Sequence, residues 1–416
     1  MDTSEPLSVV HHRCCGLDIH KRQVQACLLL TTPAGKVQQE QRSFGTMTEE
    51  LLALLDWLLA AGCTHVAMEA TGSFWKPIFN LLDGQVEIQV VNAAHIKQVP
   101  GRKTDVRDAA WIASLLRHGL LQPSFIPERS QRELRDLTRY RMSLVNERTA
   151  EVNRLQKVLE DANIKAAGVA TDMLGKSGRE MLDRMVAGET DAVRLAQCAR
   201  GKMRAKIPQL EAALAGTVRE HHRWLLEQQL SHIDDLSARI AALSERIGQL
   251  LAPFEEELAL LDTIPGVGPE TAEALLAEIG ADMGQFPDAD HLASWAGMVP
   301  GSAVSAGKHK RSKTRKGSRW LRATLVVAAQ AAGRGKGTAL GARFRALEPR
   351  RGRKRAAVAV GHSILIAAYH ILTDHLPYDE RLHQPKPRRP MPPERLVHDL
   401  EAQGFEVTIR RRDPAA

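Results

Sequence analysis

The sequence has few aromatic residues, no paired cysteine motif and no long apolar run. Aromatic side chains make up 4% of its 416 residues, so stacking on unpaired bases is not expected to be a main mode of binding. The five cysteines form no CxxC pair and no zinc spacing, which favours buried free thiols in a reducing compartment. No apolar run reaches the length of a membrane span, and MDTSEPLSVVHHRCC lacks a signal-peptide pattern. We therefore expect a cytoplasmic protein without a membrane segment.

Acidic residues are missing altogether from residues 291–347. The whole chain has a net charge of +8, which favours a polyanionic partner. The acid-free stretch contains the segment SAGKHKRSKTRKGSRWLR, and its basic residues are Lys308, Lys310, Arg311, Lys313, Arg315, Lys316, Arg319 and Arg322. Because so one-sided a run repels itself unless a polyanion neutralises it, we predict contact with a nucleic-acid backbone. A solvated loop is the alternative interpretation.

Strand-like and helix-like runs alternate in the first part of the chain, which predicts an α/β domain over residues 12–128. Two short strands are expected within 14–30. Further strands are expected near 36–44, 65–70 and 87–92, with helices at 48–62, 75–82 and 104–119.

The later part of the chain is predicted to be mostly α-helical. Apolar residues at helical intervals indicate a coiled-coil region over 129–252 with two long helices. The same apolar seam would serve a pair within one chain or a dimer interface. Residues 258–378 are expected to form a helical C-terminal domain that ends in an apolar helix after His362, and the proline-rich residues 385–416 a flexible tail.

Four carboxylates, Asp18, Glu69, Asp105 and Asp108, lie at strand ends or at the start of a helix. A charge in a strand bound for a core needs a compensating partner, and ligands collect beyond strand ends in open α/β sheets. Oxygen ligands without nearby His or Cys suit Mg²⁺ or Mn²⁺, which assist phosphoryl transfer. For Asp105 and Asp108 alone, helix capping is the stronger interpretation.

Two further segments carry candidate nucleic-acid contacts or chemistry. Gly266 and Gly268, in IPGVGP between two helical patterns, indicate a helix-hairpin-helix whose backbone N–H groups hold a phosphate. A plain connection between two helices is the alternative. Ser305 lies in the small-residue loop PGSAVSAG, and a serine hydroxyl attacks phosphorus only when a base or metal activates it. By its local sequence alone, Ser305 is a loop residue.

Eight ordered motifs between Cys15 and about Tyr378 resemble those of a known family. They are GLDIHK, MEATGSFW, VNAAHIKQVPGRKTDVRDAAWIASLLRHGLL, ELRDLTRYR, EVNRLQKVLEDANIK, IPGVGPETA, SWAGMVPG and SAGKHKRSKTRKGSRWLR. The chain is similar to insertion-sequence transposases of the Asp-Glu-Asp-Asp group, the family numbered one hundred and ten. Met298 departs from the leucine usual there.

The resemblance implies a RuvC-like (RNase H-like) fold in the N-terminal region and a C-terminal transposase domain. It gives the metal-binding role to Asp18, Glu69, Asp105 and Asp108, and the nucleophile role to Ser305, with Ser302 as a nearby second serine. It implies donor and target DNA as substrates, a structured guide RNA, and homodimers that assemble into homotetramers in the bacterial cytoplasm. The acids of one subunit would then serve the serine of another.

Three functions remain in competition. The leading one is a transposase in which Ser305 attacks a DNA phosphodiester. The second is a junction-resolving nuclease that uses metal-activated water and needs the carboxylates but not the serine. The third is a catalytically inactive nucleic-acid-binding protein, against which the intact carboxylates argue.

Overall fold

The computed structural model describes residues 8–92 except 33–34 and 71, 108–300 except 171, 304–305, 308–309, 314, 317–383, 397, 401–402 and 404–408. The chain divides into two compact units, a first unit over Met1–Pro127 and a second unit over Glu128–Ala416.

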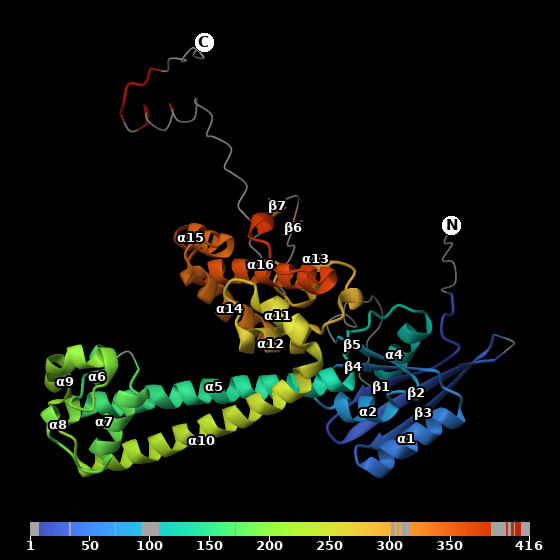
Figure 1. The fold of residues 1–416 in the computed structure, drawn as a ribbon. Helices are drawn as coiled ribbons and strands as arrows, with labels where there is room; N and C mark the ends of the chain where they lie inside the picture. The colour runs from blue at the N-terminus through green and yellow to red at the C-terminus, as the bar shows by residue number, and fades with distance from the viewer. Residues whose placement is uncertain are drawn as a thin grey trace. The chain divides into compact units, whose positions relative to one another are not determined.

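The first unit is built on a five-stranded mixed sheet with the strand order β3-β2-β1-β4-β5 (Figure 1). Its strands are β1 (Arg13–Ile19), β2 (Gln23–Thr31), β3 (Val37–Gly45), β4 (His65–Glu69) and β5 (Glu87–Val91). The first three are antiparallel neighbours, and β4 and β5 run parallel to β1. Its helices are α1 (Thr48–Ala60), α2 (Trp75–Leu82) and α4 (Asp108–Arg117).

The two faces of the sheet are covered by different helices. Leu17 of β1 packs in one core with Leu54 of α1 and Phe79 of α2. Cys14 of the same strand packs on the other face with Ile112 of α4. Because side chains alternate along a strand, even-numbered residues of β1 face α4. This alternation places Asp18 on the α4 face.

The second unit begins with a helical hairpin formed by α5 (Arg129–Asp161) and α10 (Glu220–Leu251). Leu144, Leu236 and Ile240 pack along their seam, so at these residues the seam is used within the chain. At the closed end of the hairpin a separate core includes Leu155 and Met181 (Figure 1). The short helices there are α6 (Ala166–Val169), α7 (Lys176–Val186), α8 (Ala192–Ala196), η2 (Gly201–Lys206) and α9 (Ile207–Leu214).

At the other end of the hairpin, C-terminal helices share the largest core. In order they are η3 (Ala252–Phe254), α11 (Glu255–Asp262), α12 (Pro269–Ile279), η4 (Met283–Gln285), α13 (Ala289–Trp295), α14 (Arg319–Arg334), α15 (Ala339–Arg351), α16 (Arg353–Asp374) and η5 (Glu380–His383). The strands β6 (Val304–Ser305) and β7 (Lys308–His309) pair between α13 and α14. Helix α16 is long and apolar enough to span a membrane, but 61% of its apolar window is buried within the protein, as in a core helix.

The expected mixed-sheet domain followed by a mostly helical region is confirmed. One helix boundary was wrong, because α16 begins at Arg353 and not after His362. The buried face of α16 extends back to Ala356 and Ala357, whose small side chains gave a weaker apolar signal than the isoleucines that follow.

Candidate functional site

Asp18 is placed by the close approach of α4 to β1. A Cβ atom added to Gly16 would lie 2.3 Å from Ala109 O and 2.4 Å from Ala113 N, so the backbone of α4 rests directly on this glycine. Asp108 is the first residue of α4 and precedes Ala109. The glycine contact therefore brings the start of α4 to Asp18, two residues farther along the same strand face.

Replacing Gly16 with alanine is expected to destabilise the first unit by at least about 1–3 kcal/mol, the usual range for overpacking, because the atoms it meets are backbone. Thermal unfolding followed by circular dichroism measures the loss. Gly248→Ala is the matched control, since a Cβ atom at Gly248 meets nothing within 4 Å and helical alanine is favourable. Equal melting temperatures for the two variants would show that α4 does not rest on Gly16.

Glu69 lies beside Asp18 on the neighbouring parallel strand. The register pairs Leu17 with Met68, so one step farther the two carboxylates stand side by side. Ala67 packs in the α4-side core, which puts Glu69, two residues on, on that same face. A polar cavity of about 310 Å³ opens beside Asp18 and Asp108. It is lined by Asp18, His20, Gln23, Gln25, Ala26, Gln41, Asp108, Ala109 and Ala110.

The charges of Glu69 and Asp108 both act on Asp18. Burial raises the pKa of Asp18, the charge of His20 lowers this pKa, and the charges of Asp108 and Glu69 raise it. His20 also lies 3.1 Å from Asp18, between Nε2 and Oδ2. Asp18 is thus half-buried among like charges, a position in which a carboxylate gains from a cation.

The donor chemistry of this site fits a hard divalent cation, because carboxylate oxygens are the ligands such ions take. Within the described part of the chain, however, no three His, Cys, Asp or Glu residues are grouped closely enough to hold an ion. Asp105, the fourth predicted ligand, lies outside the described residues. The site as described brings Glu69 and Asp108 within electrostatic range of Asp18 without completing a coordination sphere.

Asp18→Asn is expected to raise the melting temperature of the first unit at pH 7 in buffer without divalent cations. The folded-state pKa of Asp18 is raised, so its contribution to stability is full below about pH 3.9, the ordinary carboxyl pKa, and is lost as pH rises through the folded pKa. Neutral asparagine removes this loss. In a unit of this size, each 1 kcal/mol of added stability raises the melting temperature by about 4 °C. Melting curves of the variant and the wild type from pH 4 to 8 measure the difference. A lower melting temperature for Asp18→Asn at pH 7 would contradict the prediction.

In the second unit, Ser305 lies on a short hairpin where it pairs with Lys308. Its backbone is described and its side chain is not, and Ser302 lies outside the described residues. Where the chain enters α14, Gly317 packs tightly on the end of α13, since an added Cβ atom would lie 2.2 Å from Ala296 O. Ser318 then caps α14 by accepting a hydrogen bond from Leu321 N.

A buried ionic cluster holds Ser318. Glu278 of α12 is 2% exposed and accepts hydrogen bonds from Arg139 Nε at 2.6 Å and Ser318 Oγ at 3.0 Å. Arg135 donates through Nε to Ala277 O at 3.0 Å and stacks over Trp295. Burial lowers the pKa of Arg135 to about 10, so it is still a cation at neutral pH. The cluster ties α5, α12 and the start of α14 together.

The two glycines of the expected helix-hairpin-helix differ in their surroundings. Gly266 has φ +91° and packs on α14, because an added Cβ atom would lie 2.4 Å from Ala328 O. A Cβ atom at Gly268 would meet nothing within 4 Å, and this residue forms the N-cap of α12. Packing thus accounts for Gly266, while Gly268 has space beside it at a helix N-terminus. The phosphate-binding role of both glycines stays a prediction.

Two of the predicted basic contacts have described side chains. Arg319 is exposed and lies over the Trp320 ring, with 4.7 Å to the centroid. Arg322 is half-buried and donates to Gly297 O, so it helps to attach α14 to the end of α13. The backbone of Lys308 belongs to β7. Lys310, Arg311, Lys313, Arg315 and Lys316 lie outside the described residues.

The roles of Gly16 and Glu278 were not predicted from the sequence. Gly16 stood in the quoted motif GLDIHK, but only the tertiary packing shows that α4 needs its missing side chain. Glu278 is a lone acid in the apolar run ALLAEIG, and such a charge at a core position signals a buried partner. Its partners on α5 are about 140 residues away in sequence and gave no local signal.

Comparison with protein families gives two matches, one at each end of the chain. Residues 15–164 match the model of a family described as "Transposase", of the DEDD type of IS110. Residues 258–343 match a family described as "Transposase IS116/IS110/IS902 family". The first match contains the carboxylates, and the second contains Glu278 and Ser305.

Curated relatives agree with these matches. The "Transposase for insertion sequence element IS1111A" of Coxiella burnetii is 27% identical over 86% of this chain and 89% of its own length. The "Pilin gene-inverting protein" of Moraxella bovis is 30% identical over 40% of this chain. The insertion element IS900 42 kDa protein of Mycobacterium paratuberculosis is 32% identical over 54% of it.

The chain spans 58% of the length of the Moraxella bovis relative and 60% of that of the mycobacterial one. The IS1111A transposase is matched over most of both chains. With family matches at both ends of the chain, these comparisons show that the chain is similar to insertion-sequence transposases of the IS110/IS116 type.

Proposed function

We propose that this chain is a DNA transposase that cuts and rejoins the ends of an insertion sequence. The observation that carries the proposal is the placement of Asp18 against Asp108 and Glu69 on one face of the sheet. The strand order β3-β2-β1-β4-β5, with an antiparallel half and a parallel half, supports a RuvC-like nuclease fold. The acid-free basic segment supports a polyanionic substrate.

The four carboxylates Asp18, Glu69, Asp105 and Asp108 would hold Mg²⁺ or Mn²⁺, which when bound lowers the pKa of an attacking hydroxyl and neutralises charge on the phosphate. Ser305 is the attacking group in this proposal. Its oxygen forms a bond to phosphorus as the bond to the departing DNA oxygen breaks, which leaves a serine–DNA phosphodiester. A DNA hydroxyl of a new partner strand can later attack the phosphorus of this linkage. The serine–phosphorus bond then breaks, the serine oxygen regains a proton, and the DNA is rejoined without an external energy source.

Partners follow from the same proposal. The enzyme acts on donor and target DNA in the bacterial cytoplasm, guided by a structured RNA, and works as dimers that assemble into tetramers. In such an assembly Ser305 of one subunit meets the carboxylates of another. The basic residues between Lys308 and Arg322 would bind nucleic-acid backbone next to Ser305.

Asp18→Asn is expected to reduce Mg²⁺-dependent cleavage of a donor-junction DNA by at least about 100-fold, because the site loses a charged ligand. Denaturing gels of end-labelled DNA measure cleavage with Mg²⁺ and with EDTA. Asp56→Asn, an exposed carboxylate on α1 of the same unit, should cleave like the wild type. Normal cleavage by Asp18→Asn would remove this residue from the site, and cleavage in EDTA would remove the metal.

A further inference from the structure

We propose that a cavity at the closed end of the α5–α10 hairpin is a second binding site for the phosphodiester backbone of a nucleic acid, distinct from the Lys308–Arg322 segment. This hairpin-end cavity has a volume of about 500 Å³. The start of α7, the η2 helix and the end of α6 line it. It lies at the opposite end of the hairpin from the C-terminal helices (Figure 1).

The cavity is strongly cationic. Its lining includes four cations and a single carboxylate, namely Lys176, Arg200, Lys202, Lys206 and Asp172. Arg200 is paired with Glu180 at 2.5 Å, but the three lysines form no ion pair with any residue that the structure describes. Asp172 accepts a hydrogen bond from Leu174 N at 2.9 Å, so one of its oxygens is engaged in the turn. A bound anion would therefore meet unneutralised lysines.

Two of the four cations, Arg200 and Lys206, are anchored by the fold around them. Arg200 N donates to Ser177 Oγ at 3.0 Å, which joins η2 to the first turn of α7. Lys206 Nζ donates to Val169 O at 2.9 Å and keeps two further protons for a ligand. Helix α7 starts after Gly175 with no side-chain cap, so its first N–H groups add positive potential to the lysines.

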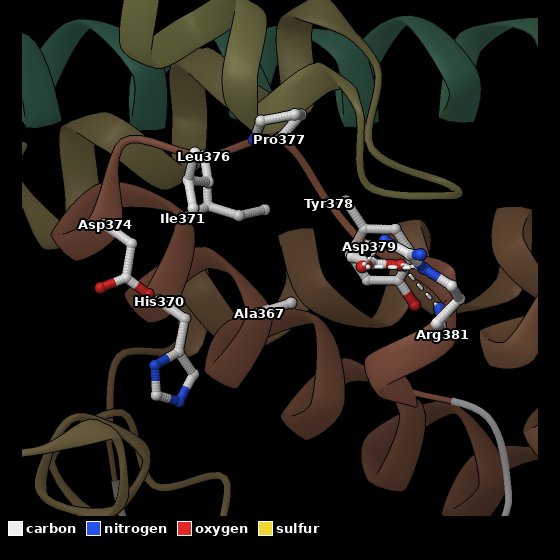
Figure 2. Close-up of a pocket in the computed structure, with 9 residues that line it drawn as sticks. All are labelled: Ala367, His370, Ile371, Asp374, Leu376, Pro377, Tyr378, Asp379 and Arg381. Carbon is white, nitrogen blue, oxygen red and sulfur yellow. Dashed lines mark hydrogen bonds and ion pairs between the residues drawn. The ribbon is translucent and has the colours of Figure 1, made fainter.

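Another cavity of similar size in the same unit lacks this character. It lies between the end of α16 and the segment that follows, and has a volume of about 480 Å³ (Figure 2). Its cation, Arg381, is bound to Asp379 at 2.9 Å between Nη2 and Oδ2, and Asp374 adds a further negative charge. The net charge of +8 of the whole chain therefore does not by itself make a cavity in this unit basic.

The distance between the hairpin-end cavity and the C-terminal core favours a nucleic-acid polymer over a small phosphate as the occupant. Helix α10 has 32 residues and is therefore about 48 Å long, which separates the hairpin-end cavity from the C-terminal core. A duplex of roughly 14 base pairs spans that length at 3.4 Å per pair. A nucleic acid bound at the C-terminal end can reach the cavity, and each phosphate it contacts there releases counterions.

The test compares the full-length chain with a Lys176→Ala/Lys202→Ala/Lys206→Ala variant. Fluorescence anisotropy with a 30-base-pair DNA duplex and an RNA stem of equal length, measured across salt concentrations, gives the affinity and its salt slope. We expect at least about tenfold weaker binding and a slope smaller by roughly 2–3 for at least one probe, since three phosphate contacts are lost. The probe that responds identifies DNA or RNA as the occupant.

The matched control is Arg154→Ala/Arg239→Ala/Arg246→Ala, which removes three exposed charges from the same hairpin. Equal losses of affinity in the two triple variants would overturn the proposal. It would also be overturned if the cavity variant bound both nucleic-acid probes like the wild type and differed only in its binding of inorganic phosphate. If the cavity variant melts early, Lys202→Gln alone should still lower the slope by about one. The binding assay is run without Mg²⁺ and measures no strand cleavage, so a failure of this site is distinguishable from a failure of the cleavage mechanism.

Discussion

Glu278→Ala is expected to lower the free energy of unfolding of the second unit by about 3–5 kcal/mol, because breaking a buried ion pair leaves an uncompensated charge. Arg139 loses two hydrogen bonds, at 2.6 and 3.0 Å, and Arg135 loses the negative charge beside it. Ser318 loses the acceptor of its hydroxyl proton. The change therefore also loosens the point where the Ser305 segment enters α14.

Urea unfolding followed by circular dichroism measures this effect. Asp235→Ala provides the control, since it removes a carboxylate from an exposed Arg–Asp pair on α10 and should leave the free energy of unfolding almost unchanged. Glu278→Gln keeps an acceptor for Ser318 and should fall between the two. A loss for Glu278→Ala no larger than that for Asp235→Ala would show that the cluster does not stabilise the unit.

Ser305→Ala is expected to abolish any covalent protein–DNA adduct and to reduce strand cleavage by more than about a thousandfold, as removal of a nucleophile does. Alanine suits the position structurally, because the β6–β7 hairpin is held by backbone pairing between Val304 and His309 and between Ser305 and Lys308. Denaturing gels with a labelled donor junction reveal the adduct. The melting temperature should stay unchanged, which separates chemistry from folding.

The control for this experiment is the neighbouring serine, and the pattern of adduct formation and strand cleavage separates the competing functions. Ser302→Ala should form the adduct normally, and a loss confined to that variant would transfer the nucleophile role to Ser302. Strand cleavage that persists without an adduct in both variants would favour a junction-resolving nuclease that uses water. No cleavage by the wild type on any junction would favour a nucleic-acid-binding protein without catalysis.

Much of the first unit was predictable because its signals are local. Short strand-like runs between helix-like runs predicted the five strands to within about two residues, and the carboxylates stood out as charges at the ends of apolar runs. What brings Asp18 to Asp108 was not predictable, since it depends on α4 packing against Gly16 about 95 residues away in sequence. The alternation of side chains along a strand predicts which face of the sheet a residue occupies, but it does not predict which element packs on that face.

In the second unit too, local features were predictable from the sequence and tertiary contacts were not. The two long helices followed from their heptad-like spacing, yet that spacing could not decide between an internal pair and a dimer. The structure shows Leu144 packed with Leu236 and Ile240 within the chain. The hairpin-end cavity was not predictable from the sequence, because Lys176 and Lys202 lie far apart along the chain and form no charge run.

We propose that carboxylates of the first unit and a serine of the second serve one reaction, and peptide mapping of the DNA-linked fragment by mass spectrometry tests this proposal. When the wild-type protein is incubated with a donor junction and Mg²⁺, we expect DNA on the peptide that contains Ser305. We expect no DNA on that peptide in the Asp18→Asn protein. An adduct on a different residue, or an undiminished adduct in Asp18→Asn, would contradict this proposal.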